Sequence, residues 1–259
     1  MGLIEGRVAI LTGAGNEVVQ GIARRFSREG AKVVLVAADE ETASAAAKGI
    51  AGAEGRAADI ATPAGAEALA SAVLAAHGRI DILLNGGHAA LKWDRLADKD
   101  PLDFTAAFAA VVQPAVNLMK AVYPAMKQAG GGRIVNLGSI YGPTANEGVT
   151  DAVTMDGALT LLTRAAGVEW AKDGILVNFL QGAMPDIAVF NEYRARRAAS
   201  VATLIGNTAM PRLADPVEDI GGAAMFLVSD EACFIVGHRV LADGGQHLTA
   251  AVFEPGAER

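Results

Sequence analysis

The sequence predicts an α/β protein: a doubly wound parallel sheet of about seven strands flanked by helices. Short apolar runs alternate along the chain with longer Ala-rich stretches of helical pattern. The apolar runs are continuous, which is typical of strands that are buried on both faces. Alternation of strands with helices implies right-handed βαβ units and a parallel sheet. We therefore expect a single domain over residues 1–259.

Each element is predicted from its own run of residues. Strands are expected at 7–12, 31–37, 55–58, 80–85, 132–138, 174–180 and 238–242. Helices are expected near 17–29, 40–50, 64–77, 102–129, 151–172 and 215–229. The stretch 182–212 is the largest insertion between regular elements, and we expect it to form a lid or a substrate loop.

Composition excludes several classes of protein. The chain has 259 residues, of which 52% are hydrophobic and 20% charged, as in a large folded domain. Its net charge of −7 argues against nucleic acid as a partner. Cys233 is the one cysteine, so an internal disulfide and a multi-cysteine metal site are excluded, and no other metal motif is present. The first residues lack a secretory pattern and no apolar run reaches about 18 residues, so we expect a cytoplasmic protein with no membrane partner.

The functional residues are expected at one edge of the sheet. In a doubly wound fold, ligands bind beyond the carboxyl ends of the strands. That edge is predicted to be formed by residues 13–19, 37–39, 59–62, 86–94, 139–156 and 181–210.

Several motifs occur in a recognisable order. They are the Thr12-Gly13 turn, Asp59 after the third strand, IDILLN with Asn85, GRIVNLGS with Ser139, LTRAAGVEWAKDGILVN, and PRLADPVEDIGGAAMFLVSDEACFIVG followed by LADGG. In this order and spacing the chain resembles the short-chain dehydrogenase/reductase family over almost its whole length. The resemblance implies a Rossmann-type sheet, an NAD or NADP cofactor, and a catalytic set of Asn, Ser, Tyr and Lys. It also implies a homodimer or homotetramer, with ACFIVGHRVLADGG resembling the segment that pairs subunits.

Most of that catalytic set is absent. Ser139 matches the serine, but Ala152 stands at the tyrosine position and Asp156 at the lysine position. The helix position of the asparagine is Val111 or Val112. Alanine has no proton to donate, and an aspartate would raise a neighbouring phenol's pKa where lysine lowers it.

The phosphate-binding turn also departs from the family pattern. Gly13 and Gly15 are present, but Glu17 and Val19 replace the two later glycines. Glycine there lets the backbone approach a pyrophosphate, and we expect the branched side chain of Val19 to obstruct that approach. The Glu17 carboxylate either occupies the place of a phosphate or is an ordinary first-turn acid that stabilises its helix.

The remaining cofactor positions are partly kept. Asp59 and Asn85 match the adenine side, and Asp39 is one step beyond the position of the acid that binds the NAD ribose. His88 replaces the last glycine of the asparagine-rich turn. We therefore expect Gly13, Gly15, Asp59 and Asn85 to be a vestigial cofactor site, with no cofactor bound, or NAD or NADP if the chain is an oxidoreductase after all.

Four residues are candidates for catalysis: Ser139, Tyr141, Asp156 and His88. Ser139 is a catalytic hydroxyl or a strand-end hydrogen-bonder. Tyr141 is a substrate contact or an acid, or it packs with a polar tip. Asp156, expected among apolar side chains, is a general base of raised pKa or a partner in a salt bridge. His88 is a proton shuttle or fills the space of an absent cofactor.

The substrate pocket is expected to include Trp93, Ala152, Gln181 and Tyr193. The arginines that follow Tyr193 bind an anionic group, or they form a solvated helix face or a subunit contact.

The hypothesis that these residues favour is a non-redox acid–base enzyme. It would be a dehydratase or hydratase, an isomerase or a carbon–carbon lyase acting on a small, mostly apolar carbonyl or hydroxyl compound. The alternatives are an atypical NAD(P)-dependent oxidoreductase and a non-catalytic protein that binds a ligand or an active relative.

Overall fold

The computed structural model describes residues 2–87, 93–138, 141–142, 148–182, 185, 187, 205 and 209–248. Seven parallel strands form one sheet in the order β3-β2-β1-β4-β5-β6-β7. The strands are β1 (Val8–Thr12), β2 (Lys32–Ala37), β3 (Ala53–Ala57), β4 (Ile82–Asn85), β5 (Gly132–Gly138), β6 (Ile175–Gly182) and β7 (Arg239–Ala242). The strand order reverses between β1 and β4, which confirms the doubly wound fold.

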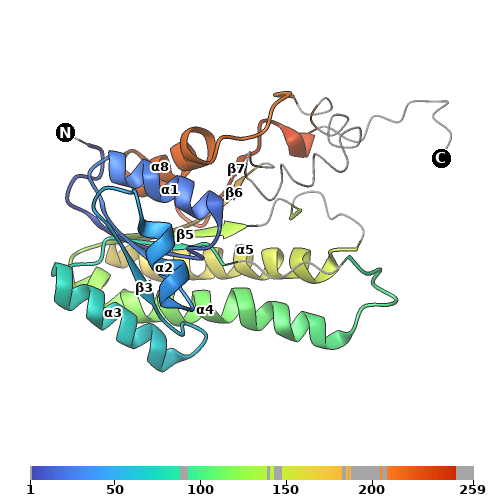
Figure 1. Cartoon of the computed structure of the whole chain (residues 1–259), viewed down its shortest axis with the longest axis horizontal. Coiled ribbons are helices and arrows are strands. Elements are labelled where there is room, and N and C mark those ends of the chain that lie inside the picture. The colour runs from blue at the N-terminus through green and yellow to red at the C-terminus, as the bar shows by residue number, and fades with distance from the viewer. Residues whose placement is uncertain are drawn as a thin grey trace.

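Helices cover both faces of the sheet. They are α1 (Glu17–Arg28), α2 (Glu40–Ala47), α3 (Pro63–His77), α4 (Pro101–Gln128), α5 (Thr150–Trp170) and α8 (Gly221–Val228). Figure 1 shows α3, α4 and α5 on one side of the strands and α1 and α8 on the other. The boundaries predicted for these elements lie within about two residues of the observed ones, apart from the end of the second helix. The helix expected at 215–229 is a turn over Pro216–Ile220 followed by α8.

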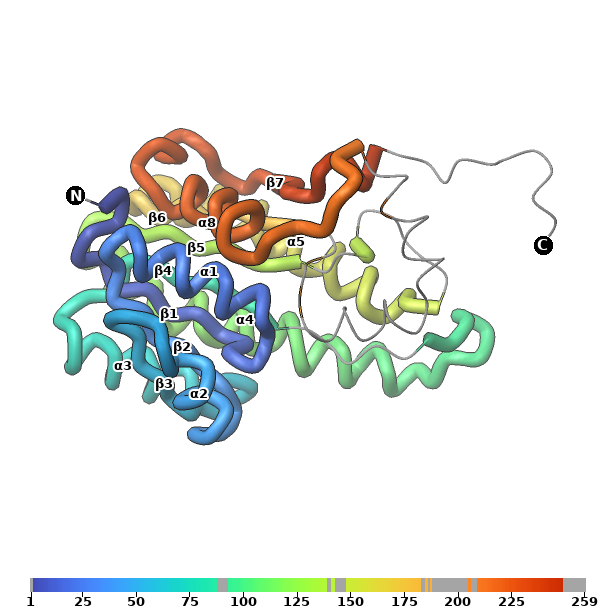
Figure 2. Tube along the Cα trace, turned by 45° about the horizontal axis from the view of Figure 1, so that its top comes forward, coloured from blue at the N-terminus to red at the C-terminus, as the bar shows by residue number. Residues whose placement is uncertain are grey.

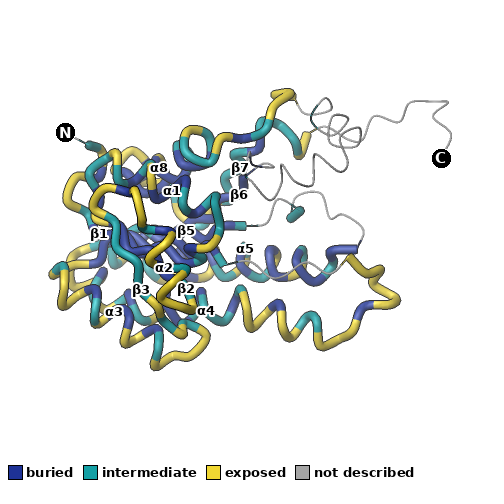
Figure 3. Tube along the Cα trace, in the orientation of Figure 1, coloured by how far each residue is buried: buried dark blue, intermediate teal, exposed yellow. Residues whose placement is uncertain are grey.

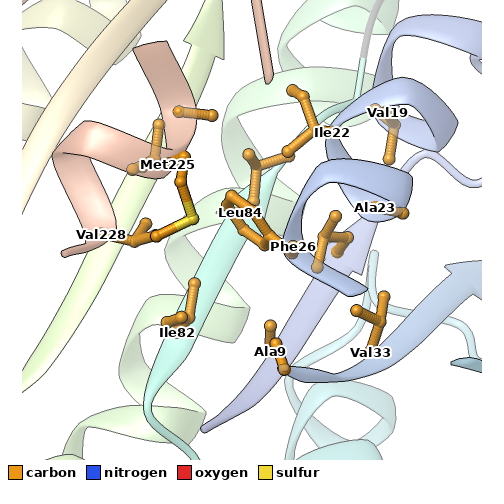
Figure 4. Close-up of a cluster of buried hydrophobic side chains, with 14 of the residues drawn as sticks. Ala9, Val19, Ile22, Ala23, Phe26, Val33, Ile82, Leu84, Met225 and Val228 are labelled. Carbon is orange, nitrogen blue, oxygen red and sulfur yellow. The ribbon is translucent and has the colours of Figure 1, made fainter. Parts of the chain in front are cut away.

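Two apolar cores follow from the alternation of side chains along the strands. Ala9 and Leu84 lie on the side of α1 and α8, in one cluster with Phe26 and Met225 (Figure 4). Their strand neighbours point the other way, toward α3 and α4. Figure 3 shows the inner strands and the inward faces of the helices as buried, the edge strands β3 and β7 as intermediate, and the outer helix faces as largely exposed. The domain is thus held by burial on both faces of the sheet.

Helix α4 is the one helix in the described part of the chain that is long and apolar enough to cross a membrane. This differs from the expectation from the sequence that no segment reaches that limit. One third (33%) of its most apolar stretch is buried, and the helix packs between α3 and α5. A core helix of a soluble protein passes the same test, so the finding is weak evidence for a membrane span.

A buried ion pair ties the loop before α4 to the first turn of α5. Lys99 Nζ lies 2.9 Å from Asp151 Oδ1, and the two side chains are 0% and 4% exposed. Removing one partner of a buried pair leaves an uncompensated charge, which is far more costly than losing an exposed pair.

We expect Lys99→Met to lower the free energy of unfolding by about 3–5 kcal/mol. Lys127→Met is the matched control, because Lys127 pairs with Asp173 but is half exposed, and its loss should cost about 1 kcal/mol or less. Urea unfolding followed by circular dichroism measures both. A Lys99→Met protein as stable as the control variant would show that the pair contributes little.

Candidate functional site

The candidate site lies where the strands end, at the reversal between β1 and β4. The turns after β1, β2 and β3 meet at this edge with residues 86–87, 141–142 and 181–182 (Figure 2). Parallel strands all present their carboxyl ends on one side, so residues far apart in the sequence converge there.

The turn after β1 keeps the geometry of a phosphate-binding turn. Gly13 has a φ of +79°, and a Cβ built on it would lie 2.5 Å from the carbonyl oxygen of Gly86. Glycine is therefore required at this position. Asn16 caps α1, with its Oδ1 accepting a hydrogen bond of 2.9 Å from the backbone N–H of Val18. Gly15 is exposed, and Glu17 is the half-buried first residue of the helix.

Val19 does not stand in the crevice, so the obstruction expected from the sequence is wrong. Its side chain is 0% exposed and belongs to the core between α1 and the sheet. A Cβ at Gly86 would lie 2.5 Å from Val19 Cγ2, so the valine fills the space that a side chain at position 86 would need. The core therefore accommodates valine at position 19.

Two carboxylates border the adenine side of the crevice. Asp39 caps α2, accepting hydrogen bonds from Thr42 N at 2.7 Å and Thr42 Oγ1 at 2.9 Å. The hydrogen bond from the Thr42 backbone is the main cause that lowers the pKa of the Asp39 carboxyl, which is therefore ionised at neutral pH. Asp59 is also exposed, and its Oδ1 accepts a hydrogen bond of 3.2 Å from Ala61 N.

Asn85 begins a buried chain of hydrogen bonds beneath the crevice. Its Nδ2 donates to Asn136 Oδ1 at 2.8 Å, and Asn136 Nδ2 donates to Thr163 Oγ1 at 2.9 Å. Asn85 Oδ1 is buried and has no hydrogen-bond partner among the described residues. The glycine cradle, the exposed carboxylates and this unused acceptor together fit the adenosine half of a dinucleotide. Glu17 adds a negative charge beside the place of the pyrophosphate.

The two family positions on α5 are both buried, Ala152 in the first turn and Asp156 one turn later. Asp156 is not in the apolar surroundings expected for a general base of raised pKa. Its Oδ2 lies 3.1 Å from Nη2 of Arg239 on β7, so the carboxylate is paired with a guanidinium, which is the salt bridge that the sequence offered as the alternative. Arg239 Nε also donates to Gln181 Oε1 at 2.7 Å, so Gln181 contacts the ion pair.

Trp93 and Tyr141, which lie far apart in the sequence, are in contact. Their ring centroids are 5.4 Å apart with planes at 87°, the edge-to-face arrangement that aromatic pairs prefer. Gly148, just before α5, lies against the same tryptophan. Trp93 is 60% exposed, so much of its ring is open to solvent.

Three of the predicted site residues, His88, Ser139 and Tyr193, lie outside the described residues, as does most of the insertion at 182–212. Conversely, the sequence interpretation did not include Arg239. The signal that pointed to it was the aspartate at position 156, because a buried carboxylate requires a nearby cation or donor.

Comparison with known proteins gives a consistent result. The family model described as enoyl-(acyl carrier protein) reductase matches residues 13–247. Oxidoreductase UcpA of Escherichia coli K12 is 32% identical over 263 residues, covering 97% of this chain and 98% of that protein. D-threitol dehydrogenase of Mycolicibacterium smegmatis is 30% identical and covers 93% of each chain. The crystal structure of a putative short-chain dehydrogenase/reductase from Burkholderia xenovorans superposes with a TM-score of 0.87 at 27% identity, over 96% of this chain and 100% of that one.

These findings overturn two expectations from the sequence. The first is the non-redox lyase or isomerase, because the relatives matched over nearly the full length are named oxidoreductases and dehydrogenases. The second is the absence of a cofactor, because such names imply use of NAD or NADP. Both expectations gave the substitutions on α1 and α5 more weight than the pattern of the whole chain.

The matching segment spans most of the chain, and the sheet order and the order of motifs agree with it. The chain belongs to the short-chain dehydrogenase/reductase family.

Proposed function

We propose that this protein is an oxidoreductase that uses NAD to interconvert a small, mostly apolar alcohol and the corresponding carbonyl compound. The observation that carries the proposal is the match to relatives named oxidoreductases and dehydrogenases over more than nine-tenths of the chain. The crevice at the reversal between β1 and β4 supports it, because its residues fit a nucleotide.

The crevice favours NAD over NADP. Asp39, Glu40 and Glu41 follow β2, at the point where the family binds the adenosine ribose. The ionised Asp39 accepts a ribose hydroxyl hydrogen and repels a 2′-phosphate. Gly13 and Gly15 let the backbone approach the pyrophosphate, and Asp59 and Asn85 bind the adenine side.

Tyr141 is the proton donor and acceptor in this proposal. A bound nicotinamide would supply the hydride acceptor when an alcohol is oxidised. Tyr141 Oη accepts the hydroxyl proton, directly or through water, as it releases its own proton to solvent. Its edge-to-face contact with the exposed Trp93 supports this role, because it holds the tyrosine ring in one orientation beside solvent. Ala152 leaves room for the substrate where the family carries its tyrosine.

The other candidate residues have supporting roles. By the resemblance to the family, Ser139 orients the substrate oxygen, while His88 and Tyr193 remain candidates for substrate contacts outside the described residues. Asp156 is not a base here, because its charge is paired with Arg239.

We also propose a cytoplasmic homo-oligomer, a dimer or tetramer, paired through residues 232–245. Strand β7 is at the edge of the sheet, and an open edge strand is a template for pairing with another chain. Phe234 and Val236, just before it, are 99% and 42% exposed, so two apolar side chains stand beside this open edge.

Thermal unfolding tests the cofactor. NADH at a hundred times its dissociation constant should raise Tm by roughly 5–10 °C, and NADPH should raise it much less. Asp39→Ser keeps a residue that can cap α2 but removes the negative charge. It should therefore reduce the difference between the Tm shift caused by NADH and the Tm shift caused by NADPH. Asp100→Ser, which alters the cap of α4, is the control and should leave the difference unchanged. No shift with any of NAD, NADH, NADP and NADPH would refute the proposal.

Tyr141→Phe tests the proton donor. The variant keeps the ring against Trp93 but lacks the hydroxyl, so turnover of an alcohol identified by an NADH-absorbance screen should fall about 10²–10⁴-fold. NADH affinity should be unchanged. Tyr123→Phe is the matched control, because that hydroxyl binds Asp173 away from the crevice. Turnover by Tyr141→Phe within threefold of the wild type would exclude Tyr141.

Phe234→Asp tests the assembly. It places a charge on the proposed contact and should reduce the molar mass measured by light scattering to that of a smaller species. Leu74→Asp, on the outer face of α3, introduces the same charge at a less exposed apolar position and should leave the mass unchanged. An unchanged mass for both variants would place the subunit contact elsewhere.

A further inference from the structure

Three elements meet at one buried cluster at the edge of the candidate site. Asp156 comes from α5, Gln181 from the end of β6 and Arg239 from the start of β7. The Arg239 guanidinium lies 3.1 Å from Asp156 Oδ2 and also donates to Gln181. The same guanidinium lies over the Phe179 ring at 5.4 Å, which adds a cation–π contact.

The chain after β5 rests directly on this cluster. A Cβ at Gly142 would overlap Asp156 Oδ2 and would lie 2.7 Å from Gln181 Nε2. A Cβ at Gly138, the last residue of β5, would lie 2.6 Å from Asp156 Oδ1. The carboxylate therefore touches the backbone at both places, and glycine is what allows it to do so.

The Arg239 guanidinium holds the Asp156 carboxylate in place. Asp156 is 4% exposed, and a buried carboxylate is tolerated only while its cation and hydrogen-bond donors are in place. Because Gly142 packs on this fixed oxygen, the position of its neighbour Tyr141 depends on the ion pair. The edge-to-face contact of Tyr141 with Trp93 then also depends on the Asp156–Arg239 ion pair.

We propose that the Asp156–Arg239 ion pair is the support that sets the position of Tyr141 against Trp93, and that Asp156 and Arg239 are positioning residues. The family carries a cation at this position of α5, whereas here the charge is reversed and its partner comes from β7. The pair therefore has a different task from the family's lysine. Only the catalytic part of this inference depends on the role proposed above for Tyr141.

A single-tryptophan protein reports on the position of Tyr141 without any activity. The chain has two tryptophans, so Trp170→Phe leaves Trp93 as the one emitter. In that background, Asp156→Asn and Arg239→Met should change the near-UV circular dichroism of the Trp93–Tyr141 pair and lower the fluorescence anisotropy of Trp93. Gly142→Ala, which inserts a methyl group into the carboxylate and alters no charge, should do the same. Arg7→Met removes an ion pair with Asp230 at the opposite end of the sheet and should change neither signal.

Measurement of kcat provides a second test. Asp156→Asn should lower kcat about tenfold when Tyr141 is present and cause no further loss in the Tyr141→Phe background, since residues that act as one unit are not additive. Equal losses in the two backgrounds would overturn the inference, as would an unchanged Trp93 signal in folded Asp156→Asn and Gly142→Ala proteins. A changed Trp93 signal in a protein without dehydrogenase activity would support the ion pair and refute the proposed function instead.

Discussion

A parallel sheet must be covered by helices on both of its faces, and the rest of this molecule follows from that constraint. Ile10 and Leu11 are adjacent in β1, yet they belong to two separate cores on opposite sides of the sheet. With both faces occupied, the carboxyl ends of the strands are the place where loops can vary without exposing the core. The substitutions relative to the family are concentrated at that edge, and the sheet order is preserved beneath them.

The reversed charge on α5 illustrates how a buried site tolerates such a change. A lone carboxylate at position 156 would be expelled or neutralised. Arg239 prevents this, and its guanidinium is itself held by Gln181 and the Phe179 ring. The lysine of the family faces the cofactor, whereas this carboxylate is directed toward β6 and β7. The change therefore removes from α5 the cation that the family carries there and puts a buried ion pair in its place.

The sequence predicted the fold well because the signals for it are local and repeated. The continuous apolar runs of β1, β2 and β6 and the Ala-rich helices have an unambiguous period. The boundaries of β3 were less accurate because its residues, AEGRA, form an edge strand with little apolar character. A salt bridge was one alternative for Asp156, but its partner Arg239 could not be predicted, nor could the pair Lys99–Asp151, because only the packing of α5 brings these residues together.

Position 19 shows why local rules misjudged the cofactor site. A glycine in the phosphate-binding turn is required either for approach of the ligand or for close packing of the helix, and the sequence alone does not distinguish the two. Here the Val19 side chain faces inward. Its neighbour is Gly86, in the turn after β4, and not a phosphate. The lack of a side chain at position 86 provides the volume that Val19 fills, and the backbone of the turn keeps its shape through Gly13. A substitution in a binding motif can therefore be interpreted only once the direction of its side chain is known. Of the two residues that replace glycines of the family turn, Glu17, at the start of α1, is the one that would bring a negative charge near a bound phosphate.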